Sequence, residues 1–209
     1  MIQKDEERLK PRRKPIQERS IKRAQEIMDV TAKILDRVGF DDLTTILITK
    51  ELGISVGSLY HYFPNKHAIL RSLAESWLKD WDIVLDEISL FNVEEIPLED
   101  LVSKLTNRFK ALYLQQKGIL PLVHAMYAVP ELRDLDAEHD RIVAKRMTEV
   151  FIRCGFKQPK TEINRIASIY LDITHSMLVK ILQQRGIKAQ RSLEDLNAIC
   201  IALLKRHIQ

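Results

Sequence analysis

Small hydroxyl and aromatic side chains gather between residues 55 and 62, in the sequence SVGSLYHY. Side chains of this kind suit contact with a nucleic acid, because a hydroxyl can hydrogen-bond a base edge and a tyrosine can donate to a phosphate oxygen. A solvated helix face more often carries Lys, Glu, Gln or Arg. We therefore expect Val56 to touch a thymine methyl, Gly57 to allow close backbone approach and Ser58 to hydrogen-bond a base.

Two short helices joined by a turn must position these side chains, in the layout of a helix–turn–helix. Thr44 is an N-cap residue type, so a helix is expected to begin after it. Gly53 is expected to end that helix with a positive φ, and Ser55 to cap a second helix that runs to about Phe63. Within this second helix Leu59 lies four residues before Phe63, and both are expected to face the core.

The segment from Thr44 to Leu70, and especially VGSLYHYFPNK, resembles the DNA-binding domain of the TetR family of bacterial transcriptional repressors. The resemblance extends weakly back to about Gln17, through a Gly-Phe pair at residues 39–40. It implies phosphate contacts and base reading, with helix-capping residues beside them. The expected DNA-binding set is Thr44, Thr45, Ser55, Val56, Gly57, Ser58, Tyr60, His61, Tyr62 and Lys66.

Within this set the resemblance places the phosphate contacts on Thr45, Tyr60, Tyr62 and Lys66. Many relatives carry Lys or Gln where this chain has Val56. Apolar contact would then replace a hydrogen bond to a base, and the operator sequence cannot be copied from a relative.

Composition and periodicity predict an all-α chain. Of 209 residues, 45% are hydrophobic and 30% charged, which is ordinary for a globular protein. Apolar residues recur at helical spacing, and few segments alternate as strands do. Helices are expected over residues 17–38, 66–88, 98–116, 119–127, 131–154, 161–185 and 192–207, in addition to the two short ones.

The expected organisation is a three-helix helix–turn–helix domain joined by a long helix to a helical ligand-binding and dimerisation domain. Its parts are a flexible basic arm at residues 1–16, the DNA-binding domain at 17–66, and the effector-binding and dimerisation domain at 67–209. Asn65 is expected to cap the long connecting helix.

Basic charge is concentrated at the front of the chain. The net charge is +4, while the first 23 residues hold nine Lys or Arg against four Asp or Glu, so the rest of the chain sums to −1. Arg12, Arg13 and Lys14 lie between two prolines, where a helix is disfavoured. The segment is either an arm that follows DNA phosphates or enters the minor groove, or a solvated tail.

Cys154 and Cys200 lie far apart within helical patterns and form neither a metal-type pair nor a disulfide framework. Both are expected to be buried apolar thiols, with a redox sensor as the alternative. The N-terminus lacks the apolar stretch of a signal peptide, and no apolar run approaches the ~20 residues that span a bilayer. A cytoplasmic protein with no membrane partner is therefore predicted.

Three patterns could belong to an enzyme. The sequence GISVG, residues 53–57, fits the nucleophile elbow G-x-S-x-G, but that motif needs a strand before Ser55, so helix capping is the preferred interpretation. Asp172 and His175 at i, i+3 could form a structural hydrogen bond, anchor a ligand or hold a metal. Asp136 and His139 repeat the spacing. No catalytic residue, metal or cofactor is predicted, and a metal-dependent or hydrolytic helical enzyme remains the alternative.

The remaining helices contain aromatic and polar residues where the resemblance implies an effector pocket. Most are expected to be core, and a minority to touch a hydrophobic or amphipathic small molecule. The candidates are Trp77, Trp81, Phe109, Tyr113, His124, Tyr127, Met147, Asp172 and His175.

The last two helices are apolar over much of their surface. They resemble the pair that packs in this family against its copy as a four-helix dimer interface, and an ordinary monomer core is the alternative. The candidate interface residues are Ile173, Met177, Leu178, Ile181, Leu196, Cys200, Leu203 and Leu204. The resemblance thus implies a homodimeric, ligand-responsive regulator, usually a repressor, that binds a palindromic operator. A ligand-independent DNA-binding protein is a further alternative.

Overall fold

The computed structural model describes residues 18–116 and 118–208, apart from the side chains of residues 127, 128 and 131. Within these ranges the chain is helical and holds no strand, only an isolated β-bridge between Phe156 and Ile208. The all-α prediction is therefore confirmed. The predicted basic arm, residues 1–16, lies outside the described residues.

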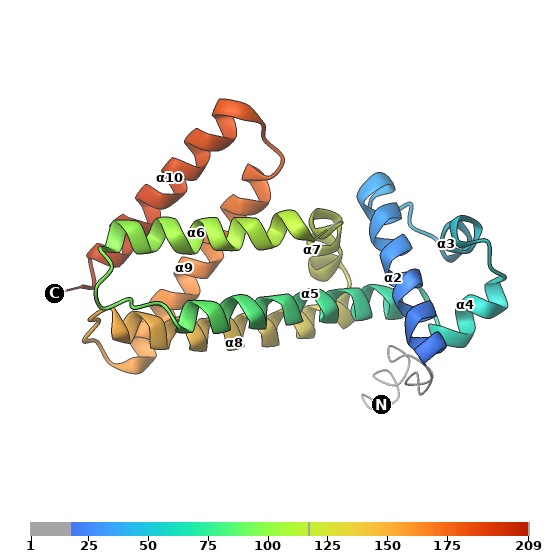
Figure 1. The fold of residues 1–209 in the computed structure, drawn as a ribbon, viewed down its shortest axis with the longest axis horizontal. Helices are drawn as coiled ribbons and strands as arrows, with labels where there is room; N and C mark the ends of the chain where they lie inside the picture. The colour runs from blue at the N-terminus through green and yellow to red at the C-terminus, as the bar shows by residue number, and fades with distance from the viewer. Residues whose placement is uncertain (1–17, 117, 209) are drawn as a thin grey trace. The chain divides into compact units, whose positions relative to one another are not determined.

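Figure 1 labels the helices of the described chain in sequence order. They are α2 (Glu18–Val38), α3 (Thr45–Leu52), α4 (Val56–Tyr62), α5 (Lys66–Ser89), α6 (Leu98–Gln115), α7 (Ile119–Ala128), α8 (Pro130–Arg153), α9 (Lys160–Ile181) and α10 (Gly186–Lys205).

The predicted helix boundaries agree with these to within a few residues except near the C-terminus. There α9 ends at Ile181 rather than at residue 185, and α10 begins at Gly186 rather than at Ser192. The first turns of α10 lack a buried stripe, and Ile187 is 64% exposed. Periodicity therefore gave no signal there, although Lys, Ala, Gln and Arg are good helix formers.

The chain divides into two compact units. Unit 1 comprises the described residues up to Lys79 together with Gln116–Asp136, and unit 2 comprises residues 80–115 and 137–208. Helices α5 and α8 therefore contribute residues to both units. The domain boundary expected between residues 66 and 67 remains a prediction.

The core of unit 1 is formed by the apolar stripes of its helices. Leu59 and Phe63 are 0% and 1% exposed, as expected for the inner side of α4. Helix α7 packs against α2 and adds its own apolar residues to the same core. The buried members from these helices include Ile27, Ile34, Leu35, Ile48, Leu59, Leu122, Ala125 and Met126.

Gly118 permits α7 to approach α2 closely. Its φ is +70°, and a Cβ added there would lie 2.6 Å from the backbone oxygen of Ala32 in α2. A side chain at this position would meet both a strained backbone conformation and a steric overlap. The contact therefore depends on glycine.

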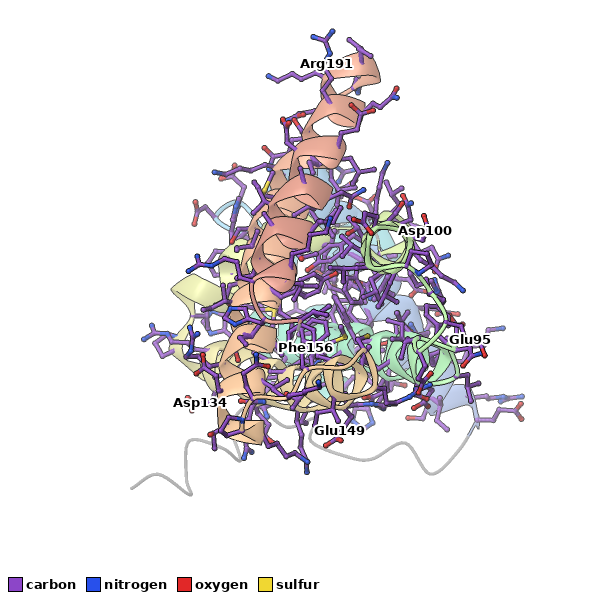
Figure 2. The ribbon with its side chains drawn as sticks, turned by 90° about the vertical axis from the view of Figure 1, so that its left-hand side faces the viewer. Glu95, Asp100, Asp134, Glu149, Phe156 and Arg191 are labelled. Carbon is purple, nitrogen blue, oxygen red and sulfur yellow. The ribbon has the colours of Figure 1, made fainter. Side chains whose placement is uncertain are left out.

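In unit 2, α10 packs against both α9 and α6. Phe156 is buried, whereas the labelled acidic side chains Glu95, Asp100 and Glu149 are exposed (Figure 2). No helix of the described chain is long and apolar enough to cross a membrane.

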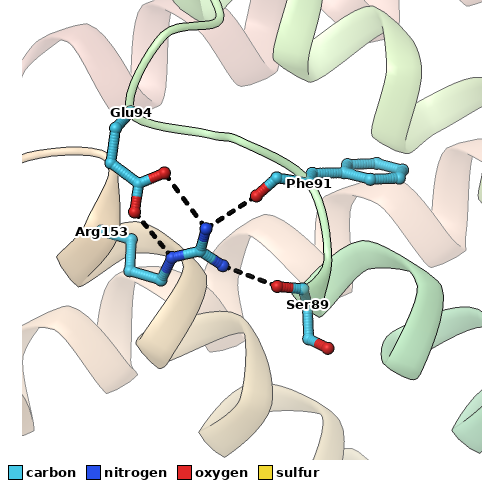
Figure 3. A network of polar contacts seen from close by, with 4 residues as sticks. All are labelled: Ser89, Phe91, Glu94 and Arg153. Carbon is cyan, nitrogen blue, oxygen red and sulfur yellow. Dashed lines mark hydrogen bonds and ion pairs between the residues drawn. The ribbon is translucent and has the colours of Figure 1, made fainter.

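Arg153 fastens the end of α8 to the segment that follows α5 (Figure 3). Its Nε and Nη2 atoms lie 2.8 and 3.1 Å from the two carboxylate oxygens of Glu94. Its Nη1 donates to the Ser89 oxygen at 2.7 Å, and Nη2 donates to the Phe91 oxygen at 2.7 Å. The hydrogen bond with Arg153 lowers the pKa of Glu94. The guanidinium thus has a structural role.

Candidate nucleic-acid interface

Three residues fix the ends of α3 and α4 as the sequence predicted. The Thr44 hydroxyl accepts a hydrogen bond from the Leu47 N–H at 3.1 Å. Gly53 ends α3 with a φ of 64°, in the left-handed region. The Ser55 hydroxyl accepts from the Ser58 N–H at 3.1 Å. Because Ser55 follows a helix and caps another, it lacks the strand context that a hydrolytic elbow requires.

The outer face of α4 presents the expected residue types. Val56 is 40% exposed and Tyr60 is 37% exposed, and Gly57 and His61 are also exposed. Ser58 is half-buried. The face is therefore apolar, hydroxyl-bearing and aromatic at the surface, and it offers groups that can meet base edges and phosphates.

Ile46 extends this surface and was not predicted. It is 70% exposed in the first turn of α3, next to Thr45. The Thr45 hydroxyl lies 3.5 Å from the Tyr60 hydroxyl, so α3 and α4 are joined at this face. Ile46 could have been recognised as exposed only from its position outside the buried face of α3. It was not, because residues 46–48 are all apolar and gave no sign of which of them faces the core.

Two of the expected phosphate contacts also have internal partners. Tyr62 is half-buried, packs against the core of unit 1 and meets the His61 ring edge to face at a centroid distance of 5.2 Å. Lys66 Nζ donates to the Leu43 oxygen at 3.2 Å and lies 4.7 Å from the centroid of the Phe40 ring. An ammonium group has three donors, so Lys66 retains donors for a phosphate.

Asn65 caps α5, as predicted. Its Oδ1 atom accepts a hydrogen bond from the Ala68 N–H at 2.8 Å. The cap fixes the first turn of α5 directly after the exposed helix α4, so Lys66 has a defined position beside the candidate interface.

Two family models match this chain. The model described as bacterial regulatory proteins, tetR family, matches residues 27–73. The model described as tetracyclin repressor-like, C-terminal domain, matches residues 97–204, which is more than half of the chain. The chain belongs to the TetR family. The resemblance found in the sequence is thereby confirmed, and the first match covers the capped helices α3 and α4.

Similar proteins include two HTH-type transcriptional regulators named BetI. The chain is 30% identical to the HTH-type transcriptional regulator BetI of Vibrio campbellii over 77 residues, 37% of each chain. It is 27% identical to BetI 1 of Chromohalobacter salexigens over 138 residues, 63% of this chain and 66% of that protein. The matches thus span less than two thirds of these relatives' length.

Solved TetR-type structures share the fold. A TetR transcription regulator from Haloarcula marismortui aligns with a TM-score of 0.67 at 17% identity, over 89% of this chain and 98% of its own. A transcriptional regulator from Saccharomonospora viridis in complex with choline aligns with a TM-score of 0.66 at 16% identity, over 85% and 95%.

The candidate effector residues occupy different environments. Phe109, Tyr113 and Met147 are buried in unit 2, and Trp77 is buried in unit 1, where its backbone oxygen accepts from the Gln116 amide at 3.1 Å. His124 is exposed. The side chain of Tyr127 lies outside the described residues.

Of the three interpretations of Asp172 and His175, a buried hydrogen bond between the two side chains is not what the structure has. Asp172 is exposed, and the His175 Nδ1 atom is hydrogen-bonded to the Tyr113 hydroxyl. The sequence could not reveal this partner, which lies on a different helix. No group of three or more metal-binding side chains is found among the described residues.

Trp81 is the centre of an aromatic and imidazole cluster in unit 2. Its ring centroid lies 5.0 Å from that of Phe109, 5.9 Å from Tyr113 and 5.7 Å from His139. The rings of Tyr113 and His175 are 5.7 Å apart. Burial lowers the pKa of His139 to about 4 and also lowers that of His175. Both imidazoles are thus neutral at pH 7.

Five of the eight candidate dimer residues are covered by the chain's own helices. These are Leu178, Ile181, Leu196, Cys200 and Leu204, which belong to the packing of unit 2 and do not form an exposed face. The reason is that α10 packs against both α9 and α6. Ile173, Met177 and Leu203 are partly exposed and remain candidates.

Neither cysteine suits a redox sensor. Burial raises the pKa of Cys154 to about 11 and also raises the pKa of Cys200. A reactive thiolate requires a lowered pKa. Cys200 is buried, as expected, whereas Cys154 is half-buried.

Proposed function

We propose that this chain is a ligand-responsive transcriptional regulator, acting as a repressor, that binds a palindromic operator as a homodimer and is released by a small-molecule effector. The exposed face of α4 carries this proposal. Val56, Gly57, Tyr60 and His61 are exposed on a helix whose ends are fixed by Ser55 and by the buried Leu59 and Phe63. Such a helix can enter a major groove as a rigid body.

The assignment of roles within the DNA-binding set follows from exposure. Val56, Gly57 and Ser58 would meet base edges, while Thr45, Tyr60 and Lys66 would hold phosphates. Tyr62 would do so through its hydroxyl only, because its ring packs on the core of unit 1. Thr44 and Ser55 would act chiefly as helix caps.

The effector would bind in unit 2. Small-molecule sites are mostly apolar with a few placed polar groups, and the cluster of Trp81, Phe109, Tyr113, His139 and His175 has this character. The choline-bound regulator of the same fold supports small-molecule binding by this architecture. Effector binding would change the orientation of α5, whose first residues follow the recognition helix, and so weaken operator binding by a coupling free energy of about 1–3 kcal/mol.

We infer that the chain is not an enzyme. The Ser55 hydroxyl caps a helix, Asp172 is exposed, and the His175 imidazole is hydrogen-bonded to the Tyr113 hydroxyl, so neither alternative assembles a catalytic group. Because a bacterial operator is in the cytoplasm, the proposed function places the protein there.

Selection of bound sequences from a random duplex pool tests this proposal. Purified protein is expected to enrich one sequence with two-fold symmetry, with half-sites separated by about 34–36 Å or a multiple. Enrichment of no sequence, or of an asymmetric one only, would contradict the proposed homodimeric regulator.

A further inference from the structure

Exposed apolar side chains of unit 1 gather on α3 and α4. Among the described residues of this unit, the exposed large hydrophobic side chains are Ile21 at 54%, Ile46 at 70%, Val56 at 40% and Tyr60 at 37%. Three of these four belong to the helix–turn–helix, and the most exposed is Ile46, in the first turn of α3. A single exposed apolar residue is ordinary on a protein surface, so the position of Ile46 must decide what it does.

Ile46 lies on the outer side of α3. An α-helix turns by about 100° per residue, so Ile46 and the buried Ile48 are about 200° apart around the helix axis. Lys50 follows Ile46 by four residues, which places it on the same side of the helix, and it is exposed. The outer side of α3 therefore combines an apolar side chain with a cation, and the cation suits a surface that meets phosphates.

This side of α3 adjoins the face of α4 that is proposed to enter the major groove. The hydroxyl of Thr45, the residue before Ile46, lies 3.5 Å from the Tyr60 hydroxyl. Val56 precedes Tyr60 by about one turn of α4, and both side chains are exposed. Ile46 is thus next to the residue that contacts Tyr60, and Val56 lies one helical turn further along the same face.

The chemistry of DNA determines what an exposed isoleucine can contact at this place. A phosphate requires hydrogen-bond donors, which an isoleucine side chain does not have, and an apolar group against a phosphate would only displace water. The apolar group that the major groove presents is the 5-methyl group of thymine. The neighbouring phosphates can be met by Lys50 and by the hydroxyls of Thr45 and Tyr60.

We propose that Ile46 is a further specificity-determining residue, which contacts the 5-methyl group of a thymine in each operator half-site, at a base pair different from the one that Val56 contacts. This deepens the proposed function and rests on its DNA-binding part. Because Ile46 and Val56 belong to different helices, α3 contributes to sequence preference together with α4.

Replacing single thymines of the operator by deoxyuridine tests the contact, because the two bases differ only in the 5-methyl group. The duplex is the one that the full-length chain selects, substituted at the same position of both half-sites, and dissociation constants are measured by fluorescence anisotropy. At one position the unmodified chain is expected to lose affinity about tenfold to twentyfold, since burial of each methyl group contributes about fourfold. This loss should be absent for Ile46→Ala and should persist for Val56→Ala.

Two measurements separate recognition from folding. Ile46→Ala is expected to melt at the same temperature as the unmodified chain or slightly higher, because Ile46 is exposed and alanine is the better helix former. Ile187→Ala removes an exposed isoleucine from α10 and is the matched control. It should show the same loss of affinity with each deoxyuridine duplex as the unmodified chain.

Three results would overturn the inference. The first is an operator at which no deoxyuridine substitution weakens binding. The second is a set of methyl-sensitive positions that is the same for Ile46→Ala and for the unmodified chain. The third is an Ile46→Ala variant that binds all duplexes more weakly by one common factor, which would place Ile46 against the DNA backbone. Each of these leaves the proposed function standing, whereas a chain that selects no operator refutes the proposed function and this inference with it.

Discussion

At the scale of single residues, the side chains on the outer face of α4 differ in which part of DNA they can contact, a base edge or a phosphate. Ser58 is half-buried, and its backbone N–H already donates to the Ser55 hydroxyl, whereas Val56, Gly57, Tyr60 and His61 are exposed. Phosphate contacts fix the position of a protein on DNA, whereas base contacts fix the sequence that is preferred. Substitutions at Ser58 and at phosphate-binding residues should therefore have different signatures.

Ser58→Ala is predicted to relax sequence preference at one position of each half-site by about 1–3 kcal/mol, because a hydrogen bond to a base edge is lost. Repeating the duplex selection with this variant measures the effect. Tyr60→Phe serves as the comparison, since loss of a phosphate contact should weaken binding to all sequences alike. An unchanged sequence preference would remove Ser58 from the base-reading residues.

His139 is predicted to make the protein sensitive to acid. Its pKa is about 4 in the folded state and about 6.5 when exposed, because burial disfavours the charged imidazole. The unfolded chain therefore binds a proton first, so this contribution to stability is complete above about pH 6.5 and is lost as the pH falls toward 4. As the pH falls from 6.5 to 4, the unfolding free energy of His139→Phe should decline less steeply than that of the unmodified chain.

The exposed His61 supplies the comparison for that experiment. His61→Gln removes an imidazole from the surface of α4, and its unfolding free energy is measured over the same pH range. If His139→Phe and the unmodified chain lose stability in parallel, the buried imidazole is not the source of the pH dependence.

At the scale of the elements, local sequence patterns were sufficient to predict where helices begin and end. They were insufficient to predict which distant residues contact one another. Thr44, Gly53, Ser55 and Asn65 each act within a few residues of themselves, so their cap roles could be predicted from residue type. The start of α10 was missed because its first turns bury no apolar stripe.

Contacts between distant segments could not be predicted in this way. Tyr113 lies 62 residues before His175, its hydrogen-bond partner, and nothing in the pattern around either residue pairs them. The same holds for the five dimer candidates that are buried in unit 2. Apolar periodicity shows that a helix face is covered, but it does not show whether the chain itself or a second copy covers it.

Two glycines offer a matched test of the contact between α7 and α2. Both have positive φ, but a Cβ at Gly53 meets nothing within 4 Å, whereas one at Gly118 would meet the Ala32 oxygen. Gly53→Ala should cost about 1–2 kcal/mol of unfolding free energy from backbone strain alone. Gly118→Ala should cost about 1–3 kcal/mol more because of the overlap. Denaturant titration measures both, and equal costs would show that α7 can move away from α2 freely.

At the scale of the whole molecule, a two-fold operator requires a two-fold protein. Leu203 is the most useful candidate for that interface, because it is partly exposed on α10 while its neighbour Leu204 is buried in unit 2. The described surface of α10 thus retains an apolar side chain that a second copy could cover.

Leu203→Arg is predicted to split the homodimer, because an unpaired guanidinium in a helical seam costs several kcal/mol. Sedimentation at low micromolar concentration should find a folded monomer that binds a half-site only weakly. Ile187→Arg, at a position 64% exposed on the same helix, is the control and should remain dimeric. A Leu203→Arg variant that stays folded and dimeric would place the interface elsewhere.

The central claim, that the exposed face of α4 binds DNA, is tested most directly by fluorescence anisotropy of the selected duplex with Val56→Asp and Ile187→Asp. Both residues are exposed, at 40% and 64%, so neither carboxylate should disturb folding. Val56→Asp is expected to lose affinity about 100-fold or more, since a carboxylate would face the phosphates and base acceptors of the groove. Ile187→Asp should bind as the unmodified chain does. Equal affinity of the two variants would contradict the account.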